Sequence, residues 1–200
     1  KVTRDGTAAT AEIEVRDDWT GTSFTLEAAM EQATDGHWQV TYLKNYRDYL
    51  DAITPLHNED IAKYSEATKN IVASYNEKLT AYKARFAALS QTSSGTFTAE
   101  QKAGLEALVE KEVIPTLQAR QQELASVEVP PGARYLADQR QQATELTRKA
   151  WQHFLAGIKN DDPDELAQAE TLNKQELAVD LRVDDIIRHT AISRSIPNLP

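Results

Sequence analysis

The chain has 200 residues, of which 40% are hydrophobic, and this is enough to form the core of a single domain. Its 31 acidic residues outnumber 22 Lys and Arg and give a net charge of −9. This balance disfavours nucleic acid or anionic lipid as the main partner, because both are bound through clustered positive charge. The sequence has no cysteine, which excludes disulfides, thiolate metal sites and thiol catalysis, and it has no apolar run near the ~18 residues of a membrane span.

Residues 1–37 form an N-terminal extension for which two structures are open. Ala11, Ile13 and Val15 alternate with charged residues, which predicts a strand, and a second alternating run after a polar turn would complete a small β-hairpin within the first 30 residues. Apolar residues at helical spacing over 25–33 favour a short helix instead. A hairpin alone is marginal in water, so it would need to dock on a bundle or on a partner.

From Trp38 the apolar spacing becomes helical, so residues 38–54 predict a shorter helix. Pro55 interrupts this pattern. Because a proline costs about 3 kcal/mol inside a helix, we expect a kink or a short break over 54–58. Asn58, which is followed by acidic residues, is suited to cap a helix that begins again there.

The most regular pattern is an apolar seam over residues 61–89, in which apolar side chains recur at steps of three and four. Such spacing keeps one narrow stripe facing a partner, so it predicts a single long bundle helix. The seam consists of Ile61, Tyr64, Thr68, Ile71, Tyr75, Leu79, Tyr82, Phe86 and Leu89.

A polar loop over 91–96 precedes the next helix, and Thr98 with Gln101 matches the capping-box pattern that opens one. The helical pattern then continues to Val127 through Pro115, which predicts a kink rather than an end.

A Val-Pro-Pro-Gly corner at 129–132 separates this helix from one over 133–159. A second corner at 160–165 is rich in acidic residues. Asp162 is placed there as N-cap before Pro163, which predicts the start of a last helix.

Together these elements predict an all-α fold. We expect an antiparallel bundle of four long helices plus a shorter N-terminal helix, with the β-hairpin as the alternative for the first 30 residues. The predicted organisation is an extension at 1–37, a helical bundle domain at 38–192 and a tail at 193–200.

Four aromatic residues within twelve positions form the strongest candidate for a ligand-binding surface. Tyr and Trp offer a large apolar area together with a polar group, which suits binding, although packing at the edge of a core explains the same pattern. The predicted ligand-binding residues are Trp38, Tyr42, Tyr46 and Tyr49.

No pattern in the sequence predicts a catalytic residue, a metal site or a cofactor. Asp185 and His189 share a helical face, but a solvated pair near a helix end explains them better than a metal site does. His153 lies beside Trp151 and Phe154, which could line a pocket, yet a lone His beside aromatic residues is more often packed than catalytic.

Residues 113–187 are similar to a recurring layout in bacterial extracytoplasmic proteins and lipoproteins of unknown function. The resemblance rests on the caps and corners of VIPTLQARQQELASVEVPPGARYLADQRQQATELTRKAWQHFLAGIKNDDPDELAQAETLN. It implies an exported helical bundle and supplies no catalytic residues. The chain begins at Lys1 rather than Met, so we expect that a signal peptide or a lipid-anchor segment precedes it.

From these observations we expect a non-enzymatic, extracytoplasmic helical-bundle protein, secreted or anchored to a membrane. It would bind a protein, a cell-envelope component or a small apolar ligand. Two alternatives are a metal- or cofactor-dependent enzyme, with a site assembled between helices from residues such as His153 or His189, and a cytosolic coiled-coil scaffold that dimerises through the 61–89 seam.

Overall fold

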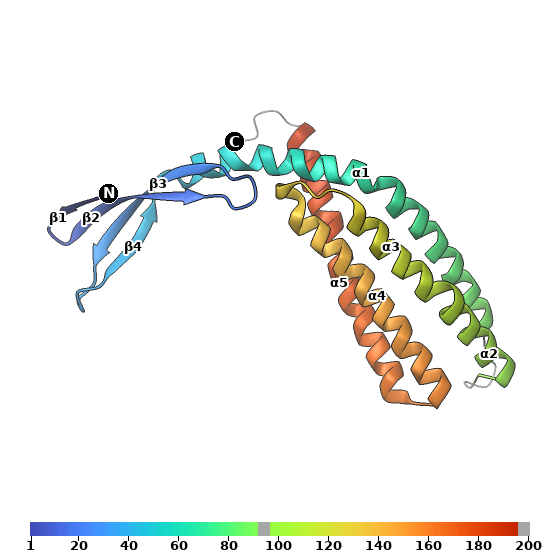
Figure 1. Ribbon diagram of the computed structural model, residues 1–200. Coiled ribbons are helices and arrows are strands. Elements are labelled where there is room, and N and C mark those ends of the chain that lie inside the picture. The colour runs from blue at the N-terminus through green and yellow to red at the C-terminus, as the bar shows by residue number, and fades with distance from the viewer. Residues whose placement is uncertain (92–96, 196–200) are drawn as a thin grey trace. The chain divides into compact units, whose positions relative to one another are not determined.

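The computed structural model describes residues 1–91 and 97–195. It begins with a four-stranded antiparallel sheet, so the all-α prediction is wrong (Figure 1). The strands are β1 (Val2–Asp5), β2 (Ala8–Arg16), β3 (Ser23–Gln32) and β4 (Trp38–Leu43). The helices are α1 (Tyr46–Leu89), α2 (Ala99–Leu108), α3 (Ile114–Ser126), α4 (Arg134–Asn160) and α5 (Pro163–Ser195).

The chain divides into two compact units. The sheet unit, Lys1–Asp60, holds the four strands and the first part of α1. The bundle unit, Ile61–Pro200, holds the rest of α1 and the other helices.

The sheet is a meander in which each strand pairs with its neighbour in the sequence. In the β2–β3 ladder, Ala11 lies opposite Ala28 and Ile13 lies opposite Leu26, so apolar side chains share one face of the sheet. Ala28 on this face is fully buried. The period-two alternation in this part of the sequence was therefore the correct signal, and the short helix over 25–33 was wrong.

The turn between β2 and β3 is fixed by hydrogen bonds and by contact with α1. Asp17 accepts hydrogen bonds from the backbone and the hydroxyl of Thr20, and its Oδ2 lies 2.9 Å from Nε2 of His57. The ring of Trp19 packs against His57 with centroids 5.2 Å apart. Burial raises the pKa of Asp17, but the hydrogen bonds from His57 and Thr20 outweigh it and lower the pKa to about 2.

The helix predicted over 38–54 is wrong in its first part, because residues 38–43 form β4. Gly36, with φ of 87°, completes the turn that returns the chain from β3 to β4. Of the kink or short break expected near Pro55, the break is wrong, because α1 continues through this residue, and the kink stays a prediction. Ile53 on one side and Tyr64 on the other are both buried, and this packing offsets the hydrogen bond that proline cannot make.

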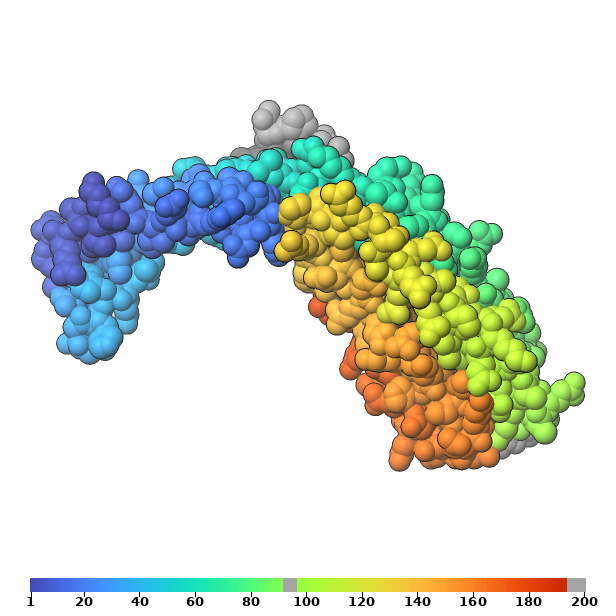
Figure 2. Space-filling model, viewed as in Figure 1, coloured from blue at the N-terminus to red at the C-terminus, as the bar shows by residue number. Residues whose placement is uncertain are grey.

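In the bundle unit, two apolar clusters hold the helices together. One contains Tyr64 of α1, Leu136 of α4 and Val183 of α5, and the other contains Leu108, Val113 and Leu117, which pack against the end of the 61–89 seam. The seam therefore faces a core, as its spacing predicted. Figure 2 shows the side chains of α3 and α4 meeting along one face of this unit.

The caps predicted at Thr98 and Asp162 are confirmed, whereas the one predicted at Asn58 is wrong, because this residue lies inside α1. Thr98 and Gln101 form a complete capping box at the start of α2, and the Asp162 side chain accepts hydrogen bonds from backbone N–H groups at the start of α5. Pro115 does not end its helix either. A π-helical turn, Val109–Val113, precedes it and lets the chain continue into α3.

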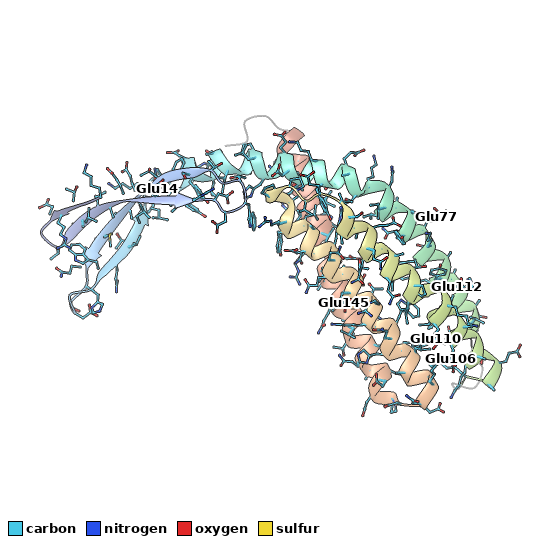
Figure 3. The ribbon with its side chains drawn as sticks, in the orientation of Figure 1. Glu14, Glu77, Glu106, Glu110, Glu112 and Glu145 are labelled. Carbon is cyan, nitrogen blue, oxygen red and sulfur yellow. The ribbon has the colours of Figure 1, made fainter. Side chains whose placement is uncertain are left out.

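Ion pairs join the π-helical turn, whose Glu110 and Glu112 are labelled in Figure 3, to two other helices. Glu110 pairs with Lys159 of α4 at 2.6 Å, and Glu112 accepts two hydrogen bonds from the guanidinium of Arg85 in α1. These pairs are at least partly exposed, so they fix the alignment of the helices more than they add to stability.

One cation is buried deeply within the bundle. The Arg140 guanidinium donates a hydrogen bond to the Thr68 hydroxyl, and it lies 5.5 Å from the centre of the Tyr64 ring. Burial lowers the pKa of Arg140, partly offset by its interaction with Tyr64. The arrangement links the first turns of α4 to α1.

Candidate functional site

The structure distributes the four predicted ligand-binding residues over two elements of the sheet unit. Trp38 and Tyr42 lie on β4, whereas Tyr46 and Tyr49 lie on α1. They therefore do not form one helical stripe. Trp38 packs against the Arg4 guanidinium, and Tyr49 makes an edge-on contact with Phe24 and a tilted ring contact with Tyr46.

The other two aromatic residues form an exposed surface. Tyr42 is 64% exposed and Tyr46 is 47% exposed, and both line a hollow of about 420 Å³ at the end of β4. The remaining lining residues are Val40, Thr41 and Leu43. This aromatic surface offers apolar area but no enclosure, so ligand binding there stays a prediction.

Mutation can distinguish the packed aromatic residue Tyr49 from the exposed aromatic residue Tyr42. Tyr49→Ser should destabilise the sheet unit by about 1–2 kcal/mol, because it removes an aromatic contact with Phe24. Hydrogen–deuterium exchange of the β2 and β3 amides should then become roughly tenfold faster or more. Tyr42→Ser is the matched control and should leave exchange unchanged, since most of this side chain is in solvent. Equal exchange in both variants would show that Tyr49 has no structural role.

The larger hollow of the bundle unit is an apolar groove between α1, α4 and α5. Its volume is about 640 Å³. Aromatic and aliphatic side chains provide most of its lining, with polar groups at its rim. The lining residues are Lys83, Phe86, Thr147, Ala150, Trp151, Phe154, Leu166, Ala169, Glu170, Asn173, Glu176 and Leu177.

Three aromatic rings form the floor of this groove. Phe86 of α1 contacts both Trp151 and Phe154 of α4, with ring centroids 5.3 Å and 5.1 Å apart. Trp151 and Phe154 also contact each other, and all three pairs are edge-to-face. This is the favourable geometry for aromatic pairs, so the floor is rigid and presents ring surface to the groove.

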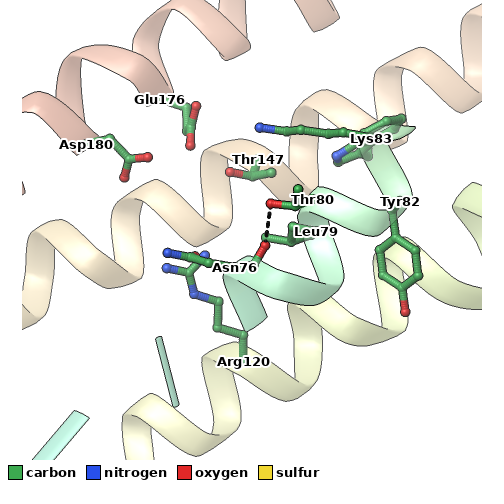
Figure 4. Close-up of a pocket in the computed structure, with 10 residues that line it drawn as sticks. Asn76, Leu79, Thr80, Tyr82, Lys83, Arg120, Thr147, Glu176 and Asp180 are labelled. Carbon is green, nitrogen blue, oxygen red and sulfur yellow. Dashed lines mark hydrogen bonds between the residues drawn. The ribbon is translucent and has the colours of Figure 1, made fainter. Parts of the chain in front are cut away.

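A charged pocket of about 260 Å³ lies next to the groove. The two hollows are adjacent, because both are lined by Lys83, Thr147, Trp151 and Glu176. Figure 4 shows Arg120 of α3 reaching into the charged pocket, with Glu176 and Asp180 of α5 extending into the same space. The site thus has an apolar body and a charged end.

The charged groups of this pocket perturb one another. Burial and then the neighbouring Asp180 carboxylate raise the pKa of Glu176 to about 7. Burial lowers the pKa of Arg120, although Asp180 and Glu176 act in the opposite direction. The Nε atom of Arg120 is buried and has no hydrogen-bond partner among the residues that the structure describes. A carboxyl with a raised pKa beside an arginine in a cleft is typical of a functional site.

The histidines lie elsewhere. His153 is paired with Glu165 at 2.5 Å, and His189 lies 3.4 Å from Asp185 with both side chains in solvent. Neither histidine lines the groove or the charged pocket. Within residues 1–91 and 97–195, His, Asp and Glu do not gather in a group of three or more that could hold a metal ion.

The sequence indicated that Trp151 and Phe154 could line a pocket, and both lie on the floor of the groove. Arg120, Glu176 and Asp180 were not predicted as site residues. These charged residues come from α3 and α5, and they carry no motif that distinguishes them from surface charges. Only the packing of helices that are distant in sequence brings them together.

Comparisons of the chain with protein-family models, with curated proteins and with solved structures find no match. The site is therefore interpreted from its own geometry. In the described part of the chain, none of the helices combines the length and the apolar character that crossing a membrane requires.

Proposed function

We propose that this protein binds a small amphipathic molecule in the groove of its bundle unit. The observation that carries the proposal is an apolar groove of about 640 Å³ that lies next to a charged pocket of about 260 Å³ and shares four lining residues with it. Ligand sites in proteins are typically clefts of roughly 300–1,000 Å³, lined by apolar and aromatic residues with a few polar groups that orient the ligand.

The groove supports binding more than catalysis. Its floor offers three rigid aromatic rings, and burial of apolar area is the main source of affinity for such a ligand. His153 and His189, the residues considered for a metal- or cofactor-dependent enzyme, lie outside it. A scaffold that dimerises through the 61–89 seam is also less favoured, since this seam faces the core of its own bundle.

The location outside the cytoplasm is part of the same proposal. The resemblance of residues 113–187 to extracytoplasmic helical bundles supports it. Fractionation of the native host, followed by mass spectrometry of the mature N-terminus, tests it. A processed or lipidated protein in the envelope fraction is the expected result, and an unprocessed cytosolic protein would contradict it.

Binding can be tested with N-phenyl-1-naphthylamine, an uncharged probe that becomes fluorescent in apolar sites. We expect saturable binding to the wild type. We expect at least tenfold weaker binding to Asn173→Trp, because Asn173 lines the groove and a tryptophan there would fill it. Asn173 is exposed, so the substitution should not disturb the core.

Gln175→Trp is the matched control, because Gln175 is exposed on the same helix but lines neither hollow. It should bind the probe as the wild type does. Saturable binding that is equal in both variants, or no binding to the wild type at all, would contradict the proposed function.

A further inference from the structure

We propose that the charged pocket selects amphiphiles whose head group is a carboxylate, with Arg120 as the anchoring residue. This inference rests on the proposed function, because the apolar part of the ligand would occupy the groove next to the pocket. It adds the chemical class of the ligand and the residue that recognises it.

The first observation is the state of Arg120. Its Nε is buried without a hydrogen-bond partner among the described residues, although its guanidinium faces the pocket (Figure 4). A buried donor that is left unpaired costs roughly 1–3 kcal/mol, and more for a charged group. A carboxylate can accept two parallel hydrogen bonds from a guanidinium, so a ligand carboxylate in the pocket would pair with the end of the Arg120 guanidinium that lines it.

The second observation is the ammonium of Lys83, which lines both the pocket and the groove. In the described part of the chain, Lys83 of α1 has no ion pair within 4.0 Å, although its charge acts on the nearby Glu176, whereas Lys159 of α4 is paired with Glu110. Two cations from different helices, α1 and α3, therefore face one space. A bound carboxylate placed between them would interact with both.

The third observation concerns the acidic groups that oppose these cations. Glu176 and Asp180 both lie on α5. They face Lys83 and Tyr82 of α1 and Arg120 of α3. Helix α4 contributes only Thr147 and Trp151 to the lining. With its pKa raised to about 7, Glu176 carries its proton on about half of the molecules near neutral pH. The two cations then outweigh the acidic charge, and the pocket favours an anion over a cation.

This arrangement predicts how binding varies with pH. Glu176 is neutral below a pH of about 7 and ionised above it. A carboxylate ligand keeps its charge over this range, so ionisation of Glu176 places a second negative charge beside it. Binding of a carboxylate should therefore weaken as the pH rises from 6 to 8.5, by about three- to tenfold.

The test uses decanoate, decanol and decyltrimethylammonium below their micellar concentrations, as competitors of N-phenyl-1-naphthylamine on the full chain. The three compounds share a chain length and differ in head group. We expect decanoate to bind roughly tenfold or more tightly than decanol, with decyltrimethylammonium weakest. Equal affinities of decanoate and decanol, or a preference for the cation, would overturn the inference.

Substitutions test which residues produce the preference for a carboxylate head group. Arg120→Met should reduce the decanoate-to-decanol ratio to about threefold or less, and Glu176→Gln should abolish the pH dependence of decanoate binding. Arg182→Met removes the same charge from an α5 residue that does not line the pocket, so it should keep both properties. If Arg120→Met fails to fold, Lys83→Met should lower the same ratio, and an unchanged ratio in that variant would count against the inference.

The two proposals fail in different ways. If N-phenyl-1-naphthylamine does not bind to the wild type, the proposed function fails and the head-group question does not arise. If the probe binds in the groove but the head groups rank equally, the proposed function stands and the inference about the carboxylate is wrong.

Discussion

Replacing Arg140 with alanine should lower the free energy of unfolding of the bundle unit by about 3 kcal/mol. Arg140 is 6% exposed, and its guanidinium donates to the Thr68 hydroxyl beside the Tyr64 ring, where both partners are buried. Alanine would remove these contacts and leave a cavity between α4 and α1. Urea unfolding followed by the helical circular dichroism signal measures the change.

Arg140→Met is the matched control for this prediction. Methionine fills much of the same space without burying a charge, and a buried charge is itself costly. We therefore expect this variant to lose less than half as much stability as the alanine variant. Equal losses would show that the hydrogen bond and the charge matter more than the volume, and no loss in either variant would contradict the packing described for Arg140.

Replacing Trp151 with alanine should have the second large effect, on stability and on binding together. The variant should lose about 3 kcal/mol of unfolding free energy, because Trp151 makes edge-to-face contacts with Phe86 and Phe154. It should also bind N-phenyl-1-naphthylamine at least tenfold more weakly, since Trp151 provides part of the groove floor. Urea unfolding and probe titration at a temperature where the variant is folded measure the two effects.

Trp151→Phe is the matched control, because it makes the side chain smaller but keeps an aromatic ring at this position. Phenylalanine keeps an apolar ring at the floor, so we expect a loss of about 1 kcal/mol and a change in probe affinity of less than about threefold. Probe binding that is as strong in the alanine variant as in the wild type would place the ligand outside this groove.

The local ends of helices were predictable from the sequence. The capping box at Thr98 and Gln101 and the N-cap at Asp162 depend on residues within one turn of each other, so a short pattern determines them. The seam over 61–89 was also readable, because a helix of this length repeats its pattern many times.

The sheet was harder to predict because its strands are short. Residues 38–43 contain Trp38, Tyr42 and Leu43 at spacings that fit a helix as well as a strand, and pairing with β3 decides between them. The Asp35-Gly36 pair was a usable signal that was missed, since Asp-Gly between two apolar runs favours a hairpin. Pro55 led to the opposite kind of error, because it suggested that the helix is interrupted there. Packing on both sides keeps α1 helical at this residue.

The candidate site was partly predictable. Trp151 and Phe154 are close in the sequence and aromatic, so they could be noticed before the structure was known. Arg120 and Glu176 are separated by more than one helix, and their importance comes from burial and from each other's charge. No pattern within a single helix contains that information, because the site exists only once the helices are packed.

An apolar ligand should bind in the groove of the bundle unit rather than on the aromatic surface of the sheet unit. Photolabelling with an uncharged alkyl diazirine, followed by peptide mass spectrometry, distinguishes these two sites. Saturable labelling within residues 147–154 and 166–177, which line the groove, is the predicted result. Labelling confined to residues 38–46, around Tyr42, would contradict the account and favour the aromatic surface instead.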